Sequence, residues 1–263
     1  MKRYSFIFFF CSLLSFAQQE VDILTRDSIT LKADRFVGID SFGALYYITN
    51  NVLFKKTDKK TYNYNNFQLG KIFSVDLLNP LEITVFYQDF NTVVQLDNTL
   101  NEVKKIDFNT IRNFRNVQYA RTGIDKQFWI FNLDNHQLEL FDYQTEKVQT
   151  LNQPIKEDVI AMTSNYNFCW LLTKSKVYQF NFYGSLLTTL PNEGYIEIEQ
   201  HNGNLLLQKD NELWYWQKNT SQPKKAHIIE KPFLQLHHSD GFVYIYRPNF
   251  IEKLPLNSAK KQK

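Results

Sequence analysis

The segment FVYIYRPNFIEKLPL, residues 242–256, holds a strong strand pattern, a tight turn and a second strand pattern. The run Phe242–Tyr246 is apolar or aromatic throughout, and the turn Arg247-Pro248-Asn249 carries residues that favour chain reversal. The run Phe250–Leu254 is more alternating, which is typical of a strand with two different faces. The segment therefore predicts an antiparallel hairpin, after which the strand pattern stops.

The same hairpin pattern recurs upstream at a spacing of roughly 40 residues, each time with a polar strand pattern after it. The second strands of the upstream units are Ala44–Ile48, Ile83–Tyr87, Phe128–Phe131, Cys169–Leu172 and Asn204–Leu207. Their continuous apolar runs predict strands that are covered on both faces. The first strands are predicted to begin near Phe36, Phe73, Val117, Ile160, Ile196 and Phe233. Four strands in each of six units predict an all-β, six-bladed β-propeller of four-stranded blades.

The last unit lacks a fourth strand, whereas an extra strand pattern, Ser28–Lys32, precedes the first unit. Pairing of this segment with Phe250–Leu254 would complete the sixth blade. It would also close the ring with strands from both ends of the chain and remove an open sheet edge. We therefore predict a ring that is closed by the N-terminal strand.

The repeats resemble those of secreted six-bladed β-propellers, with Asp89-Phe90-Asn91 and Leu96-Asp97-Asn98 as the residues that carry the likeness. The chain lacks the Gly-His and Trp-Asp signature of WD repeats, and it lacks the Asp-box pattern of sialidases. The resemblance therefore implies the architecture but assigns no subfamily. Because unrelated functions share this fold, it implies no activity.

The first residues have the pattern of a signal peptide. Lys2 and Arg3 precede a short apolar run, and Ser15-Phe16-Ala17 supplies small residues for cleavage. We predict a signal peptide over 1–17, a propeller over 18–256 and a disordered basic tail over 257–263. The residue before Cys11 is Phe10, which disfavours lipidation at Cys11. No later stretch is long enough to span a membrane, so we expect export to the periplasm or outer-membrane periphery, or beyond the cell.

Charge and motifs exclude several classes of function. The formal net charge is only +3 and opposite charges are interspersed, which disfavours nucleic acid as a partner. With eight glycines, the chain has no phosphate-binding loop, and it has no zinc-protease, Cys-x-x-Cys or Gly-x-Ser-x-Gly motif. The sequence thus predicts no cofactor, no metal site and no catalytic residue.

Polar residues on the predicted first strands are candidates to line a central channel: Asp40, Asp76, Arg121, Ser164, Glu197 or Glu199, and His237 or His238. One interpretation is a metal site that joins His237 to carboxylates of neighbouring blades. A second is a general acid–base pair of Asp40 and Asp76, which would make the protein a hydrolase or lyase. The third, which we favour, is a solvated channel without chemistry.

A binding surface is predicted where the turns between second and third strands meet the loops between blades. Aromatic residues expected there are Phe67, Phe90, Phe114, Tyr195 and Phe250, with basic residues Arg35, Arg112, Arg115, Lys156 and Arg247 nearby. Arginine and aromatic residues are enriched at recognition surfaces. We therefore predict a non-catalytic binding or scaffold module for a protein or glycan of the cell envelope. Its predicted binding residues are Arg35, Arg112, Arg115, Arg247 and Phe90.

Overall fold

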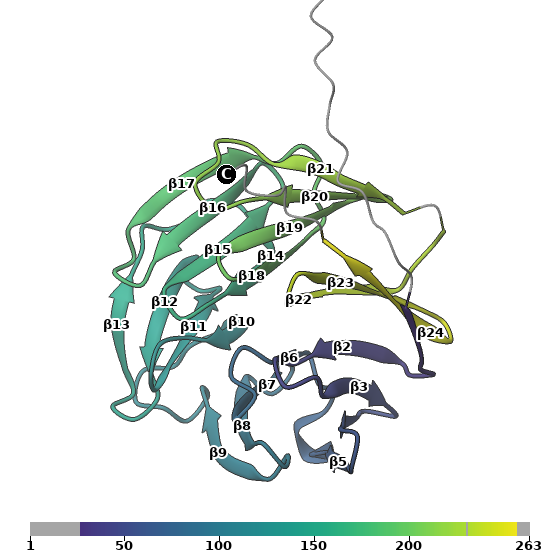
Figure 1. Ribbon diagram of the computed structural model, residues 1–263. Coiled ribbons are helices and arrows are strands. Elements are labelled where there is room, and N and C mark those ends of the chain that lie inside the picture. Colours follow the sequence, from purple (N-terminus) through teal and green to yellow (C-terminus); the bar gives the residue numbers. More distant parts are fainter. Residues whose placement is uncertain (1–26, 230, 257–263) are drawn as a thin grey trace, which may run out of the picture.

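The computed structural model describes residues 27–229 and 231–256 and confirms the predicted architecture. Six four-stranded antiparallel sheets surround a central channel, with the first strand of each sheet innermost (Figure 1). Within the described residues the one helical element is the short 3-10 turn η1 (Phe67–Leu69). No helix in that part of the chain is long and apolar enough to cross a membrane. The predicted signal peptide over 1–17 and the tail over 257–263 lie outside the described residues.

Three blades form the first half of the ring. Blade 1 comprises β2 (Arg35–Ile39), β3 (Leu45–Thr49), β4 (Val52–Lys56) and β5 (Thr61–Tyr64). Blade 2 comprises β6 (Ser74–Asp76), β7 (Glu82–Tyr87), β8 (Thr92–Asp97) and β9 (Glu102–Asp107). Blade 3 comprises β10 (Val117–Thr122), β11 (Gln127–Asn132), β12 (Gln137–Asp142) and β13 (Lys147–Leu151).

The remaining three blades complete the ring. Blade 4 comprises β14 (Val159–Ser164), β15 (Phe168–Thr173), β16 (Lys176–Asn181) and β17 (Leu186–Pro191). Blade 5 comprises β18 (Glu197–His201), β19 (Asn204–Lys209), β20 (Glu212–Trp216) and β21 (Lys224–Ile228). Blade 6 comprises β22 (Gln235–Ser239), β23 (Phe242–Arg247), β24 (Phe250–Pro255) and β1 (Asp27–Thr30).

The ring closes as the incomplete last repeat predicts. Strand β1 pairs antiparallel with β24, and Ile29 lies opposite Ile251. The pairing continues past the strand, because the N–H of Leu31 donates to the Asn249 carbonyl at 3.0 Å. The outer edge of blade 6 is thus supplied by the N-terminal strand, and the ring is held shut by both ends of the described chain.

Six apolar clusters hold the blades together, one at each contact between neighbouring blades. The second strands feed two clusters at once because successive side chains point to opposite faces. On β7, Val85 packs toward blade 1 and Phe86 toward blade 3. On β11, Phe128 packs toward blade 2 and Trp129 toward blade 4. This arrangement explains why the second strands are apolar without interruption.

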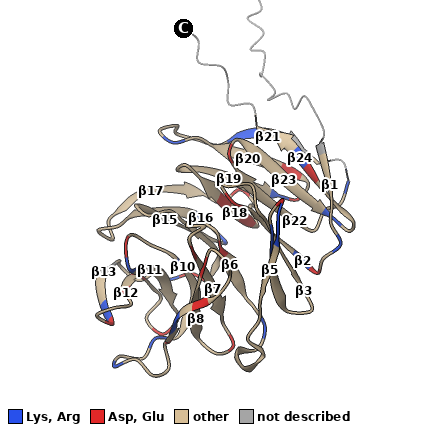
Figure 2. Ribbon diagram, turned by 60° about the horizontal axis from the view of Figure 1, so that its bottom comes forward, with Lys and Arg blue, Asp and Glu red and all other residues tan. Residues whose placement is uncertain are grey.

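Two faces can be distinguished by their loops. We call the inter-blade face the one formed by the loops that join blades and by the turns between second and third strands. The opposite first-hairpin face is formed by the turns between first and second strands, such as those at 40–44, 165–167 and 202–203. Figure 2 shows Lys and Arg interspersed with Asp and Glu around the ring, so neither sign dominates the molecule.

Asparagines in the turns of the inter-blade face have a structural role. Asn51 adopts a left-handed backbone with a φ of 60°, and its side chain accepts from the Ile72 N–H and donates to the Gly70 carbonyl. Asn91, with a φ of 51°, likewise accepts from the Val117 N–H at 3.0 Å. Each turn therefore anchors the loop that leads to the next blade, which is consistent with the tolerance of asparagine for this conformation.

Candidate functional site

Among the described residues, a cavity of about 590 Å³ lies in the channel, toward the first-hairpin face. All six blades contribute to its wall through the ends of their first strands and the turns that follow. The polar channel residues predicted from the sequence all line it: Asp40, Asp76, Arg121, Ser164, Glu197, Glu199, His237 and His238. Its volume falls within the range of roughly 300–1,000 Å³ that is usual for ligand pockets.

Strand β18 contributes three ionisable side chains to the wall, more than any other strand. Glu197, Glu199 and His201 occupy alternate positions on this strand, so their side chains share one face. That face is turned to the cavity, and the acidic segment is visible on β18 in Figure 2. The alternation Glu-x-Glu-x-His is present in the sequence, and it is the signal by which His201 could have been placed in the channel. The sequence analysis missed His201 and three further ionisable wall residues, Tyr166, Lys218 and Asp240.

Glu199 and His237 form a pair across blades 5 and 6. The Glu199 Oε2 atom accepts the His238 N–H at 2.7 Å and lies 3.5 Å from His237 Nδ1. The other ring nitrogen of His237 lies 3.2 Å from the Ile39 carbonyl oxygen. Burial opposes charge on this imidazole, but the Glu199 carboxylate and the carbonyl outweigh it, and the pKa of His237 is raised. Both ring nitrogens therefore face acceptors, which favours the charged form.

A glycine makes room for this histidine. Gly38 lies on β2 against the imidazole of His237, and a Cβ atom at residue 38 would fall 2.7 Å from that ring. Real Cβ atoms do not approach other atoms so closely, so any larger residue would displace the ring. The position of His237 in the channel thus depends on a specific residue of the neighbouring blade.

Arg121 of blade 3 lines the cavity, whereas Arg35 is the first residue of β2 in blade 1 and is not among the residues of the cavity wall. Arg121 Nε donates to the Met162 carbonyl at 3.1 Å, and Arg35 Nη1 donates to the Phe73 carbonyl at 2.7 Å. Burial, and then the charge of Arg121, lowers the pKa of Arg35. The two guanidinium groups are therefore electrostatically coupled. Among the described residues Arg35 Nη2 is buried without a hydrogen-bond partner, and Arg121 makes no hydrogen bond through its Nη atoms.

Glu197 differs from the other channel carboxylates. Its side chain reaches the cavity, and within the described part of the chain it has no hydrogen bond or ion pair. The channel walls and the neighbouring Glu199 raise the pKa of Glu197 to about 7, while Arg121 acts in the opposite direction. A carboxyl group with such a pKa changes its charge near neutral pH, which is unusual for a group that supports only the fold.

The Asp40 carboxylate, by contrast, is fully used by its own blade. Its Oδ1 atom accepts the N–H groups of Phe42 and Ala44, both at 2.9 Å. Its Oδ2 atom accepts the Tyr46 hydroxyl at 2.9 Å and lies 3.7 Å from Lys55 Nζ. Asp40 therefore shapes the first hairpin of blade 1 and has little capacity left for proton transfer.

Asp76 has a comparable role between blades. It accepts the Leu78 N–H at 2.9 Å through Oδ1 and the Thr122 N–H at 2.8 Å through Oδ2. The second bond joins blade 2 to blade 3. The acid–base interpretation of Asp40 and Asp76 thus loses its chemical basis, because both carboxylates are already engaged by donors of the fold.

The remaining histidines of the wall are held neutral. The Asp240 N–H donates to His201 Nε2 at 3.0 Å, which identifies this nitrogen as an acceptor, and burial lowers the pKa of His201. Burial and the neighbouring His201 lower the pKa of His238 to about 4. Across residues 27–229 and 231–256, no group of three His, Cys, Asp or Glu side chains is arranged to hold a metal ion.

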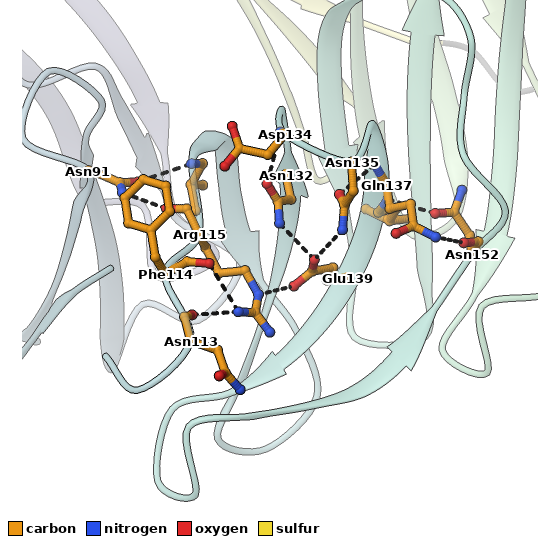
Figure 3. Close-up of polar contacts among 12 residues, drawn as sticks. Asn91, Asn113, Phe114, Arg115, Asn132, Asp134, Asn135, Gln137, Glu139 and Asn152 are labelled. Atoms are coloured by element: carbon orange, nitrogen blue, oxygen red, sulfur yellow. Dashed lines mark hydrogen bonds and ion pairs between the residues drawn. The ribbon is translucent and has the colours of Figure 1, made fainter. Parts of the chain in front are cut away.

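On the inter-blade face, Arg115 is committed to contacts within the chain (Figure 3). Its Nε donates to Glu139 Oε2 at 2.7 Å, and its Nη1 donates to the carbonyls of Asn113 and Phe114. The other carboxylate oxygen of Glu139 accepts the Asn132 side chain at 2.9 Å. The guanidinium thus joins the loop before blade 3 to the buried third strand of that blade.

Arg247 has the same role in blade 6 and is buried. Its Nε and Nη2 atoms donate to Glu252 Oε2, at 3.3 and 3.0 Å, and its Nη1 donates to the carbonyls of Lys231 and Pro232, both at 2.7 Å. Glu252 and Glu139 occupy equivalent positions, the third residue of the third strand. Two of the predicted binding arginines therefore stabilise loops of the fold.

Other residues predicted on this face lie where the sequence suggests. Phe90, Phe114, Phe67 and Arg112 are exposed. Tyr195 is a correction, because it is buried in the cluster between blades 4 and 5 instead of lying on the surface. Its ring follows the loop inward and packs beside Trp214.

Comparisons with known proteins agree with the fold. A streptogramin B lyase is 12% identical, with a TM-score of 0.59, and the match covers 88% of this chain and 98% of the lyase. A catalytically inactive virginiamycin B lyase from Staphylococcus aureus, solved with quinupristin, is 11% identical, with a TM-score of 0.58, and covers 89% and 100%.

A third solved structure is PorZ, an essential bacterial surface component of the type-IX secretion system of Porphyromonas gingivalis. It is 10% identical, with a TM-score of 0.53, over 83% of this chain and 31% of PorZ. No family model and no curated protein matches the sequence. At these identities the structural likeness shows the fold alone, and propellers of this shape include both lyases and components of larger assemblies.

Proposed function

We propose that this protein is an exported, non-catalytic binding module of the cell envelope, and that its protein or glycan partner places a polar group in the channel cavity. The observation that carries the proposal is the state of the polar groups. In the cavity, the carboxyl of Glu197 and the Nη atoms of Arg121 make no hydrogen bond to the described residues. Unpaired polar groups that converge on a preformed cavity are the usual features of a ligand site.

The inter-blade face supports the proposal by contrast. Arg115 and Arg247 use their donors within the chain, and a partner would have to break buried ion pairs to reach them. Of the residues predicted there and described by the structure, Arg112, Lys156 and the exposed aromatic residues remain available. A partner that docks there would find fewer charged donors than the sequence suggests.

A hydrolase or lyase that acts from the channel is the second candidate, and one observation favours it. Glu197, with a pKa of about 7, has the protonation equilibrium of a general acid or base, and it lies in the same cavity as Arg121 and His237. Arg121 could stabilise developing negative charge in such a reaction.

Partner capture with matched variants tests the proposal. The mature chain, Arg121→Gln and Arg112→Ala are immobilised and exposed to the envelope fraction of the native host, and bound material is identified by mass spectrometry. We expect Arg121→Gln to lose a partner that the wild type and Arg112→Ala both retain. Loss with Arg112→Ala alone would place binding on the inter-blade face. Recovery of chemically altered material would support the enzyme instead.

Export is tested separately by the intact mass of the protein from its native host. Cleavage after Ala17 predicts a mature chain that begins at Gln18 without added lipid. A chain that retains residues 1–17, or one that begins at Cys11 with an added acyl mass, would contradict this part of the proposal.

A further inference from the structure

The carboxylates in the cavity wall outnumber the cations, yet most of them are already occupied. Asp40 and Asp76 accept hydrogen bonds from their hairpins and from Thr122, and Glu199 accepts the His238 N–H. Formal charge therefore gives a misleading impression of what the cavity would attract.

The unoccupied groups include strong donors. Arg121 has both Nη atoms free of hydrogen bonds to the described residues, and Lys218 brings a second cationic side chain to the wall. A planar carboxylate matches the geometry of the guanidinium donors of Arg121.

The rest of the wall suits hydroxyl groups. The Glu197 carboxyl can accept from a hydroxyl, or donate to one when it is protonated. Tyr166, which is 39% exposed, and the partly buried Phe168 contribute aromatic surface beside these polar groups. Aromatic rings next to hydroxyl-binding side chains suit a sugar better than a compact anion.

We infer that the channel recognises a sugar acid. This inference rests on the proposed function and narrows it to one class of ligand. The sugar carboxylate binds the guanidinium of Arg121. The hydroxyls reach Glu197, and one sugar face lies against Tyr166.

Binding of an anion here must depend on pH. The ionisable groups that line the cavity are Asp40 after β2, Asp76 on β6, Arg121 on β10, Tyr166 after β14, Glu197, Glu199 and His201 on β18, Lys218 after β20, and His237, His238 and Asp240 on and after β22. Of these, Glu197 gains a proton as the pH falls through about 7, which removes a negative charge near the guanidinium of Arg121. The carboxylate should therefore bind more tightly at pH 6 than at pH 8.

The test uses three probes with one ring scaffold: glucuronate, glucose and glucosamine, titrated into the full chain by calorimetry. We expect glucuronate to bind at least tenfold more tightly than either other sugar. Arg121→Gln should weaken glucuronate at least tenfold, whereas Lys126→Gln removes a charge from the same hairpin outside the cavity and should have no effect. Glu197→Gln should weaken the pH dependence, to which the His237 imidazole still contributes, and raise affinity at pH 8. Melting curves verify that each variant is folded.

Four results would overturn the inference. Preference for glucosamine, lost in Glu197→Gln, would assign recognition to the carboxylates. Equal affinity for all three sugars would show that the cavity does not distinguish sugars by their charge. If no probe binds although partner capture depends on Arg121, the sugar-acid class is wrong and the proposed function stands. If no probe binds and partner capture is also unchanged in Arg121→Gln, the inference and the proposed function are both wrong.

Discussion

Arginines occur in two regions of this propeller, and their surroundings differ sharply. On the inter-blade face, Arg115 and Arg247 are saturated by carboxylates and carbonyls of their own chain. In the channel, Arg121 uses one nitrogen to hold its position and leaves the others facing the cavity. The difference teaches that the location of an arginine in a loop does not show that its donors are free. The following predictions test whether one region is structural and the other functional.

The largest effect is expected at Arg247. Arg247→Ala removes the two hydrogen bonds that the guanidinium donates to the buried Glu252 carboxylate and those it donates to two loop carbonyls, so the free energy of unfolding should fall by about 3 kcal/mol. Chemical denaturation measures the loss. Partner capture should survive at temperatures where the variant is folded. A change below about 0.5 kcal/mol, the range of ordinary surface substitutions, would show that this arginine is not structural.

Arg115 should show a smaller effect in the same direction. Arg115→Ala removes one donor from Glu139, which keeps the Asn132 side chain as a partner, so a loss of about 2 kcal/mol is expected. The matched comparison is Arg112→Ala, where an exposed charge is removed and the melting temperature should hardly change. Equal melting temperatures for the two variants would remove the distinction between buried and free arginines on this face.

Gly38→Ala tests whether the channel region depends on the position of the His237 imidazole. The new methyl group meets the ring of His237, so we expect the imidazole to move away from Glu199 with a stability cost of about 1 kcal/mol. The variant should bind the partner more weakly than its small loss of stability explains. Unchanged NMR shifts for the His237 imidazole would show that the ring does not depend on this glycine.

The smallest effect is expected for the stability of Glu197→Gln, and its sign depends on pH. The folded-state pKa of Glu197, about 7, lies above that of an ordinary glutamate, so ionisation is harder in the folded chain. The stabilising influence of the neutral carboxyl is complete below the unfolded pKa and is lost as the pH rises through about 7. Glutamine stays neutral, so the variant should melt higher than the wild type at pH 8 and equally at pH 4. If the melting temperatures of the wild type and Glu197→Gln differ by the same amount at every pH, the raised pKa of Glu197 is contradicted.

Much of the fold could be predicted from local pattern. The uninterrupted apolar second strands and the missing fourth strand of the last repeat indicate blades and ring closure, because burial on both faces and an unpaired edge leave traces in the sequence. Strand starts lie close to prediction, with the first strand of blade 6 at Gln235 instead of near Phe233. The period of two also allowed the polar channel residues to be placed correctly.

Local pattern could not predict which polar side chains remain free to bind a ligand and which are used by contacts within the fold. Arg115 and Glu139 are far apart in the sequence, and their ion pair depends on how a loop meets the next blade. The same is true of Asp76, whose acceptor is used by Thr122 of another blade, and of Tyr195, whose ring turns into the core. Such contacts arise only when the blades assemble.

Photo-crosslinking at two exposed aromatic positions tests the central claim most directly. Phe90 on the inter-blade face and Tyr166 in the cavity wall are 48% and 39% exposed, so each can be replaced by p-benzoylphenylalanine with similar access to a partner. The chains are expressed in the native host, irradiated, and examined for adducts by mass. The account predicts an adduct from position 166 and none from position 90. An adduct from position 90 alone would contradict it and place the partner on the inter-blade face.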